Sequence, residues 1–321
     1  MSMLIGHEEP WREWRDAMAG PRMHHAWLLA GKNGLGKMSF ALAAARELVA
    51  TPGVHQPEGD HPDIHILSHL PKDDKEERKK ADGKPFELKR NISIGQIRAM
   101  QQRLTTRPTL GERRAIIIDP ADDMEKGASN ALLKSLEEPP RGTFFLLVAH
   151  RPARLLPTIR SRCRTLRFPV IPDDQMTQLI SREAPEAGRD AVDAAVAAAN
   201  GSPGAALNFI TNDLGPLNVI MQRIARAGDP DFALRGQLAT AIGTRPDRAR
   251  VQAALDLARA VIGTMAQECD NDRIPALADA HSQLVILTGQ APTFNFDAGL
   301  LVMEIGTLLA SAAPPRDRAN A

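Results

Sequence analysis

The sequence predicts an α/β domain with a parallel sheet, followed by an all-α region. Between residues 26 and 168, short apolar runs typical of buried strands alternate with segments of helical periodicity. This alternation is characteristic of a parallel sheet that helices cover on both faces. Beyond Pro169 and Pro172 the strand-like runs disappear, and helical segments continue to about Ser311. We therefore expect three domains, which cover residues 1–169, 170–213 and 214–321.

Apolar runs and helical periodicity locate the elements of the first domain. The expected strands cover residues 26–30, 63–67, 114–119, 144–149 and 165–168. The run at 114–119 is rich in β-branched residues, which is typical of a central strand buried on both faces. The expected helices cover residues 8–19, 38–50, 93–104 and 128–138. Ser93 and Gln96 have the spacing of a capping box at the start of the third of these helices.

Two further stretches carry their own expectations. The segment Lys72–Arg90 holds eight basic and six acidic residues and almost no apolar ones, so we expect a mobile surface loop. From about Leu214 to Ser311 we expect five helical segments. Two of them have clear apolar stripes, formed by Val251, Leu255, Ala258, Ile262 and Met265 and by Leu277, Ala280, Leu284 and Leu287. Residues 314–321 are expected to form a disordered tail.

Composition excludes several classes of protein. Forty basic and thirty-nine acidic residues nearly cancel, which argues against a free-standing, strongly basic nucleic-acid binder. Cys163 and Cys269 are too few for a disulfide framework or a cysteine-based zinc site. His61, His65 and His69 stand four residues apart, but on a strand this spacing separates side chains by about 13 Å, so no metal site is predicted. No signal peptide or membrane-spanning run is recognised, and we expect a cytoplasmic protein without a membrane partner.

The segment Gly31–Ser39 almost completes the phosphate-binding pattern G-x-x-x-x-G-K-[ST]. In such a loop backbone N–H groups cradle phosphates, the lysine meets the terminal phosphates and the hydroxyl residue helps to hold Mg²⁺. Gly31, Gly34, Gly36 and Lys37 are therefore candidate nucleotide-binding residues. The hydroxyl position is Met38, whose thioether is a poor ligand for a hard cation. Ser39 comes one residue late, which on a helix turns its hydroxyl about 100° away.

A second position also departs from a working ATPase. Asp119, at the end of a predicted strand, can hold Mg²⁺ through water, and it completes the candidate nucleotide site. The next residue is Pro120, where a carboxylate would be needed to orient the attacking water. Asp122 and Asp123 are displaced by two or three residues of loop. Met38 and Pro120 therefore argue independently against hydrolysis, and the loop is interpreted as a vestigial nucleotide site.

Two further motifs match a known family. Asn130–Pro140, with the sequence NALLKSLEEPP, closely resembles a signature of bacterial clamp-loader AAA+ subunits, and Ser161-Arg162-Cys163 resembles their S-R-C motif. The resemblance implies an AAA+ P-loop domain, a small helical lid domain and a C-terminal helical collar domain that holds an oligomer. Glycine and proline follow Ser202 where catalytic members carry a lid arginine, and no cysteines mark the zinc module that many members carry.

The resemblance implies a clamp-loader subunit without intrinsic ATPase activity. Its partners would be the gamma/tau and delta subunits and, through the assembled complex, the sliding clamp and primer-template DNA. Arg162 would act as an arginine finger toward ATP bound by a neighbouring subunit, and Ser161, Arg162 and Cys163 would lie at that interface. The plainer interpretation is that Arg162 is a surface residue in an arginine-rich run.

No cofactor is expected to be required, although weak binding of ATP stays open. One alternative function is an active, gamma-like ATPase, which Lys37 and Asp119 would support. Another is a general DNA-binding protein, which would bind DNA alone in a salt-sensitive way.

Overall fold

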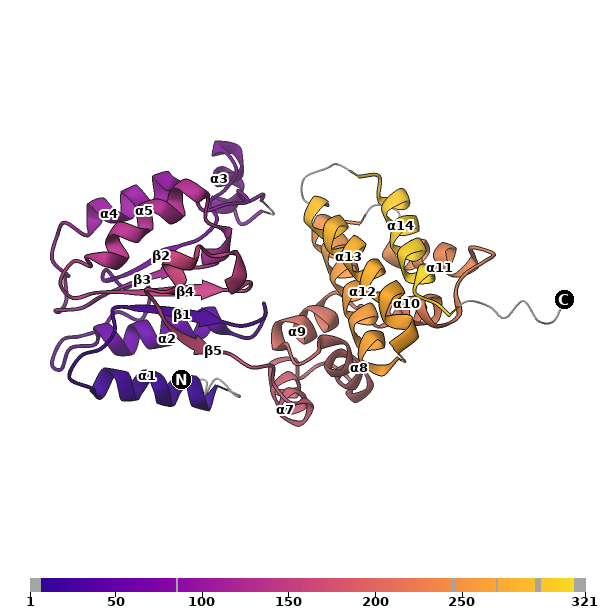
Figure 1. Ribbon diagram of the computed structural model, residues 1–321, viewed down its shortest axis with the longest axis horizontal. Coiled ribbons are helices and arrows are strands. Elements are labelled where there is room, and N and C mark those ends of the chain that lie inside the picture. Colours follow the sequence, from indigo (N-terminus) through magenta and orange to yellow (C-terminus); the bar gives the residue numbers. More distant parts are fainter. Residues whose placement is uncertain (1–6, 85, 244–245, 270, 292–295, 315–321) are drawn as a thin grey trace. The chain divides into compact units, whose positions relative to one another are not determined.

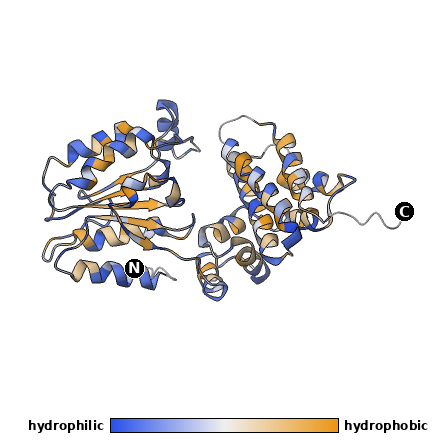
Figure 2. Cartoon of the chain, viewed as in Figure 1, coloured by the Kyte–Doolittle hydropathy of each residue, from blue (hydrophilic) through white to orange (hydrophobic). Residues whose placement is uncertain are grey.

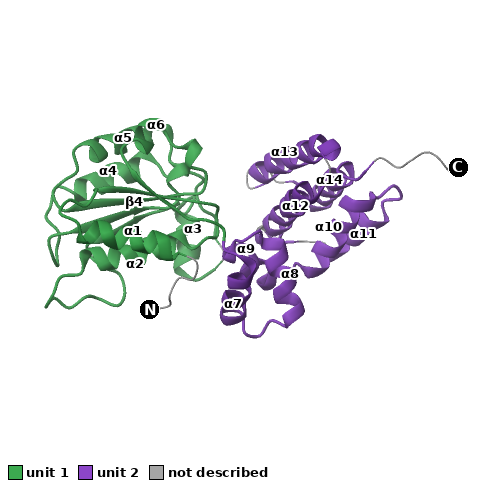
Figure 3. Ribbon diagram, turned by 60° about the horizontal axis from the view of Figure 1, so that its bottom comes forward, with its two compact units in different colours: residues 1–170 green, residues 171–321 purple. Residues whose placement is uncertain are grey.

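The computed structural model describes residues 7–84, 86–243, 246–269, 271–291 and 296–314 (Figure 1). The chain divides into two compact units, residues 1–170 and residues 171–321 (Figure 3). The boundary lies between Val170 and Ile171, one residue beyond the expected end of the first domain at residue 169. Most of the tail expected at 314–321 lies outside the described residues.

The first unit contains a five-stranded parallel sheet. Its strands are β1 (Ala26–Ala30), β2 (Ile64–Leu67), β3 (Arg114–Ile118), β4 (Thr143–Ala149) and β5 (Arg164–Arg167). They lie in the order β2-β3-β4-β1-β5, and each neighbouring pair is parallel. The predicted parallel α/β architecture and its five strands are confirmed.

Helices cover both faces of this sheet (Figure 1). On one face lie α1 (Glu8–Ala19) and α2 (Lys37–Val49), and on the other lie α4 (Ile94–Arg103) and α5 (Lys126–Glu137). Because side chains alternate along a strand, Trp27 and Leu29 of β1 enter the cluster under α1 and α2, whereas Leu28 enters the cluster under α4 and α5. Figure 2 shows the apolar residues gathered on the strands between these helices. The central strands are therefore buried on both faces, as the sequence of residues 114–119 predicts for β3.

The capping box at the start of α4 is confirmed. Gln96 Oε1 accepts a hydrogen bond from the Ser93 backbone N–H at 3.0 Å. Ile97 and Met100 on the same helix are buried against the sheet.

The expectation of a loop throughout Lys72–Arg90 is wrong, because residues 74–81 form helix α3 (Asp74–Ala81). The Asp73 carboxylate accepts hydrogen bonds from the backbone N–H groups of Lys75 and Glu76 and so caps this helix. Glu76 is only 6% exposed, since its carboxylate binds Lys79 and the backbone N–H of Glu87. Local charge pairing and a capping aspartate thus order a segment whose composition suggests mobility.

The second unit is helical throughout its described elements. These are α7 (Asp173–Glu183), α8 (Arg189–Ala199), α9 (Pro203–Thr211), α10 (Gly215–Ala227), α11 (Ala233–Ile242), α12 (Arg248–Glu268), α13 (Ile274–Gln290) and α14 (Ala298–Ser311). All residues of the two predicted stripes belong to or pack against a single hydrophobic cluster that extends from Ile171 to Ala312, to which α12 also contributes Ala253, Ala254, Leu257 and Val261. Because α8 packs against α10 and α12, the predicted lid and collar regions share this cluster. None of the described helices is both long and apolar enough to cross a membrane.

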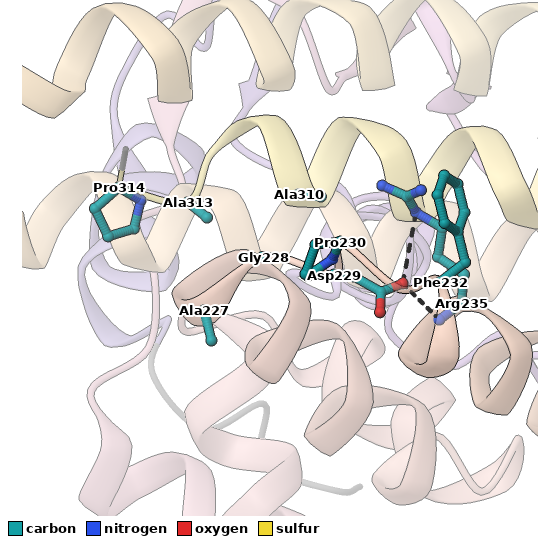
Figure 4. A pocket seen from close by; sticks show the side chains of 9 residues that line it. All are labelled: Ala227, Gly228, Asp229, Pro230, Phe232, Arg235, Ala310, Ala313 and Pro314. Carbon is teal, nitrogen blue, oxygen red and sulfur yellow. Dashed lines mark hydrogen bonds and ion pairs between the residues drawn. The ribbon is translucent and has the colours of Figure 1, made fainter. Parts of the chain in front are cut away.

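A buried ion pair joins three helices of the second unit beside a cavity of about 420 Å³ (Figure 4). Asp229, between α10 and α11, accepts hydrogen bonds from the backbone N–H groups of Leu234 and Arg235 and thereby caps α11. The Arg235 guanidinium lies 3.7 Å from the Asp229 carboxylate and 4.4 Å from the centre of the Phe232 ring. Its side chain crosses α14 at Gly306, where a methyl group would come within 2.6 Å of Arg235 Cγ. This contact holds α11 against α14.

The turn that follows α5 generates a test of the first unit's stability. Gly142 has a φ of +76°, and a Cβ there would collide with the Glu112 carbonyl oxygen, whereas Gly83 has a φ of +68° with open space around it. We expect Gly83→Ala to lower the free energy of unfolding by about 1 kcal/mol and Gly142→Ala by about 2–4 kcal/mol. Urea unfolding followed by tryptophan fluorescence measures this, because Trp11, Trp14 and Trp27 all lie in the first unit. Equal losses for the two variants would contradict the steric argument.

Candidate functional site

The candidate residues divide between the two edges of the parallel sheet. Gly31, Asp119 and His150 directly follow β1, β3 and β4, so they lie at the edge where the strands' carboxyl ends meet. Arg162 precedes β5, whose Arg164 pairs in register with Trp27 of β1, so Arg162 lies near the level of His25 at the opposite edge. Six residues of extended chain separate that level from Gly31, which corresponds to roughly 20 Å. The sequence-predicted residues therefore form two separate groups.

The glycine loop has the strand–loop–helix setting that its sequence predicts. Gly34 and Gly36 adopt positive φ values of 77° and 75°, and Gly36 is the residue from which α2 starts. Glycine is the residue that adopts this left-handed conformation without a steric penalty. Gly31 N donates a hydrogen bond to Ala149 O at 3.3 Å, which ties the start of the loop to the end of β4. The loop is thus held at the carboxyl edge of the sheet.

Lys37 is turned into its own loop. Its ammonium donates hydrogen bonds to the carbonyl oxygen of Gly31, at 2.8 Å, and to that of Lys32. The residue is only 2% exposed. Burial lowers the pKa of Lys37 to about 8, an effect that the nearby carboxylates of Asp119 and Asp122 partly offset. The group that would meet terminal phosphates is therefore already paired with backbone carbonyls.

The two residues after Lys37 provide no hydroxyl at the loop. Met38 is half-buried and packs against the hydrophobic cluster between the sheet and the helices α1 and α2. Ser39 is exposed on the surface of α2. The Mg²⁺-binding hydroxyl of the motif is therefore replaced by an apolar contact.

Asp119 stands beside the loop at the end of β3. Burial raises the pKa of its carboxyl group, and the charges of Lys37 and His69 partly offset this rise. Its Oδ1 lies 3.9 Å from Nε2 of His150 and accepts no hydrogen bond within the described part of the chain. The peptide bond to Pro120 is cis.

The other carboxylates near Asp119 have structural partners. Asp122 accepts hydrogen bonds from the backbone N–H groups of His150 and Arg151, at 2.9 and 3.0 Å, and its side chain is 1% exposed. Asp123 lies within 3.7 Å of three cationic or ionisable groups, those of His69, Arg151 and Arg154. Neither carboxylate occupies the place of a base that orients water.

His150 and His69 also lie beside Asp119 at the carboxyl edge, although the sequence analysis did not place them there. His150 directly follows a buried strand, as Asp119 does, and this position could have predicted that it lies at the carboxyl edge of the sheet. Burial lowers the pKa of His150, and the charge of Lys37 lowers it further, so the imidazole is neutral at pH 7. His69 reaches the site through a loop after β2, which no local pattern predicts. Among the described residues, no group of three or more His, Cys, Asp or Glu side chains could hold a metal ion.

The second group surrounds Arg162 at the amino edge of the sheet. Arg162 Nη2 lies 2.6 Å from Glu137 Oε1, and Nη1 donates a hydrogen bond to Thr158 O at 2.9 Å. The Ser161 hydroxyl donates to the same carbonyl at 3.2 Å. Cys163 packs against the cluster under α4 and α5, and burial raises the pKa of its thiol to about 12. Ser161 and Cys163 therefore anchor the turn, while the Arg162 side chain keeps about a third of its surface exposed.

Comparison with known protein families identifies the first unit. Residues 6–172 match the family described as "DNA polymerase III, delta subunit". The chain belongs to this family. The matched region includes both edges of the sheet, from the glycine loop to the S-R-C turn.

Several DNA polymerase III subunits resemble this chain at moderate sequence identity. The delta' subunit of Pseudomonas aeruginosa is 31% identical over 208 residues, which cover 60% of this chain and 58% of that protein. The delta' subunit of Bacillus subtilis is 34% identical over 174 residues, which cover 50% and 47%. The tau/gamma subunit of Haemophilus influenzae is 27% identical over 176 residues, which cover 54% and 24%. The matches thus span about half the length of the delta' relatives.

The pKa of Lys37 generates a prediction about stability. It is about 8 in the folded chain and 10.5 for an unperturbed lysine. Between these values the unfolded chain binds more protons than the folded chain, so the free energy of unfolding rises with pH. Lys37→Met removes this titration. We expect the stability of the parent relative to Lys37→Met to rise from about pH 7 to about pH 10, measured by urea unfolding. A difference that stays constant over this range would contradict the prediction.

Proposed function

We propose that this chain is a delta-prime-like, non-hydrolysing subunit of a DNA polymerase III clamp loader. It helps the assembled loader to place the sliding clamp on primed DNA with ATP that neighbouring subunits hydrolyse. Its own chemical contribution is Arg162, which acts in trans on a neighbour's nucleotide. The observation that carries the proposal is the position of Arg162 at the amino edge of the sheet, opposite the chain's own glycine loop.

Geometry favours action on another subunit's nucleotide. A side chain that stabilises a transferring phosphoryl group must approach its oxygens within hydrogen-bond distance. The sheet separates Arg162 from the loop at Gly31 by roughly 20 Å along the strands, well beyond the reach of one arginine side chain. A guanidinium that contacts a γ-phosphate can raise the rate of hydrolysis by about 10³-fold or more. Arg162 can provide this effect only where a second chain's nucleotide faces the amino edge.

The state of the chain's own loop supports the absence of intrinsic hydrolysis. The Lys37 ammonium is bound to loop carbonyls, and Met38 replaces the hydroxyl that would bind Mg²⁺. Pro120 lacks an acid–base group, and Asp122 is bound to backbone N–H groups. No cofactor is required in this proposal. Weak binding of ATP would require Lys37 to exchange the carbonyls of Gly31 and Lys32 for phosphate oxygens.

The partners in this proposal are the gamma/tau and delta subunits of the loader. The sliding clamp and primer-template DNA are reached through the assembled complex. The names of the delta' relatives and the match to the family over residues 6–172 support this assembly. The second unit, with its helices α10 to α14, would provide the collar contacts.

The isolated chain provides one test. We expect no ATP hydrolysis above background by the purified chain, and no change on Lys37→Ala, because the loop lacks a metal-binding hydroxyl and a base. A coupled assay with Mg²⁺ and ATP measures this. Turnover that Lys37→Ala abolishes would contradict the proposal and would identify a gamma-like ATPase.

The reconstituted loader provides the second test. With gamma/tau and delta subunits, the clamp and primed DNA present, we expect Arg162→Ala to reduce hydrolysis at the facing site by about 10³-fold. The steady-state rate of ATP hydrolysis by the whole loader then falls by at least the fraction that this site contributes. Arg160→Ala is the matched control, because Arg160 is exposed two residues away in the same turn. Co-elution of all subunits verifies assembly. Unchanged DNA-stimulated hydrolysis in an assembled Arg162→Ala loader would refute the trans role.

A further inference from the structure

The end of helix α5 breaks a local rule. Helix carbonyl groups that lack intrahelical partners give the C-terminus a partial negative charge, so cations are favoured there and anions are not. Helix α5 nevertheless ends with Glu137 and continues into Glu138. Local conflicts of this kind are expected at functional or strained sites. Glu137 is therefore a residue whose position calls for a tertiary explanation.

Arg162 provides that explanation for Glu137. The carboxylate of Glu137 lies 2.6 Å from Arg162 Nη2, so the two side chains form a close ion pair. Arg162 comes from the turn after α6 (Pro157–Arg160), which packs against α5. The cation of one element thus compensates the unfavourable anion at the end of another.

A second acceptor holds the same guanidinium. Arg162 Nη1 donates a hydrogen bond to Thr158 O, a carbonyl at the end of the one-turn helix α6. Two different nitrogens of Arg162 are therefore fixed by two different elements, α5 and α6. Because the guanidinium is planar and rigid, two such contacts determine its orientation.

Most of the donors of Arg162 have no hydrogen-bond partner within the described part of the chain. A guanidinium carries five N–H donors, of which one on Nη1 donates to Thr158 O, while Nη2 is paired with the Glu137 carboxylate. The geometry points to Glu137 as a positioning residue, which together with Thr158 O orients Arg162 so that its other N–H groups can contact a phosphate. This inference rests on the proposed trans role of Arg162. It assigns Glu137 a role in the neighbour's hydrolysis without any contact with the nucleotide.

Positioning, and not competition with phosphate, is the direction that the contacts favour. Phosphate oxygens can accept hydrogen bonds from the N–H groups of Arg162 that face neither Glu137 nor Thr158, while Glu137 keeps its ion pair. The Glu137 side chain is 50% exposed, so solvent screens its charge and weakens its opposition to an incoming anion. An arginine that is already oriented loses less conformational freedom when it engages. Removal of Glu137 should therefore slow hydrolysis.

The experiment compares variants of two adjacent glutamates in the reconstituted loader. Glu137→Ala should lower kcat for clamp- and DNA-stimulated hydrolysis at the facing site by roughly tenfold, with KM for ATP unchanged. Glu137→Gln should lose less, because its amide oxygen can still accept from Arg162. Glu138→Ala is the matched control, since Glu138 is exposed and the described ion pair of Arg162 is with Glu137. It should retain the parent's kcat.

A double-mutant cycle separates positioning from general destabilisation. In an Arg162→Ala background, Glu137→Ala should cause no further loss, because the group that it orients is gone. A further loss in that background, or an unchanged or raised kcat for Glu137→Ala alone, would overturn the inference. If Glu137→Ala does not assemble, the near-isosteric Glu137→Gln makes the same comparison.

Failure of the underlying proposal gives a different pattern. Arg162→Ala alone would then leave hydrolysis unchanged, whatever the glutamate variants do. If Arg162→Ala lowers hydrolysis and both Glu137 variants do not, the trans role stands and the positioning role of Glu137 is refuted.

Discussion

Strand β1 pairs with β4 on one side and with β5 on the other, and the location of both candidate sites depends on these pairings. The glycine loop leaves the carboxyl end of β1 at Gly31. The register with β5 brings Arg164 opposite Trp27 and so keeps Arg162 near the amino end. Because every strand of the sheet is parallel, no small rearrangement of a loop could bring these two groups together. Arg162 therefore cannot reach a nucleotide bound at the chain's own glycine loop.

The two edges differ in how their polar groups are satisfied. At the carboxyl edge, Lys37 is bound to loop carbonyls, Asp122 to backbone N–H groups and Asp123 to cationic side chains. These contacts provide partners for polar groups that are buried at this edge. At the amino edge, Arg162 is paired with Glu137 and donates to Thr158 O, and its other N–H donors have no hydrogen-bond partner among the described residues. The Lys37 ammonium is thus satisfied within the chain, whereas part of the Arg162 guanidinium has no partner among the described residues.

The S-R-C turn and the end of α5 form one structural feature, although residues 138–160 separate them in the chain. Ser161 and Arg162 both donate to Thr158 O, and Cys163 packs into the cluster that α5 also covers. The turn before β4 links the end of α5 to the sheet, because Gly142 O accepts a hydrogen bond from the backbone N–H of Arg114. The acidic end of α5 therefore belongs to the same rigid corner as the arginine.

The sequence by itself determined the elements and the chemistry that could be present. Apolar runs such as 114–118 predict burial on two faces, and the capping box at Ser93 predicts the start of a helix. Met38 and Pro120 stand where an ATPase would carry a hydroxyl and a carboxylate. The sequence is sufficient for these predictions because each signal is local. Only the tertiary structure decided the contacts between distant residues. In the structure β4 lies between β1 and β3, and Lys37 is turned toward its own loop. Contacts of Glu76 stabilise α3, and Arg162 pairs with Glu137. Such contacts depend on how separate elements pack, and neither periodicity nor a short motif carries that information.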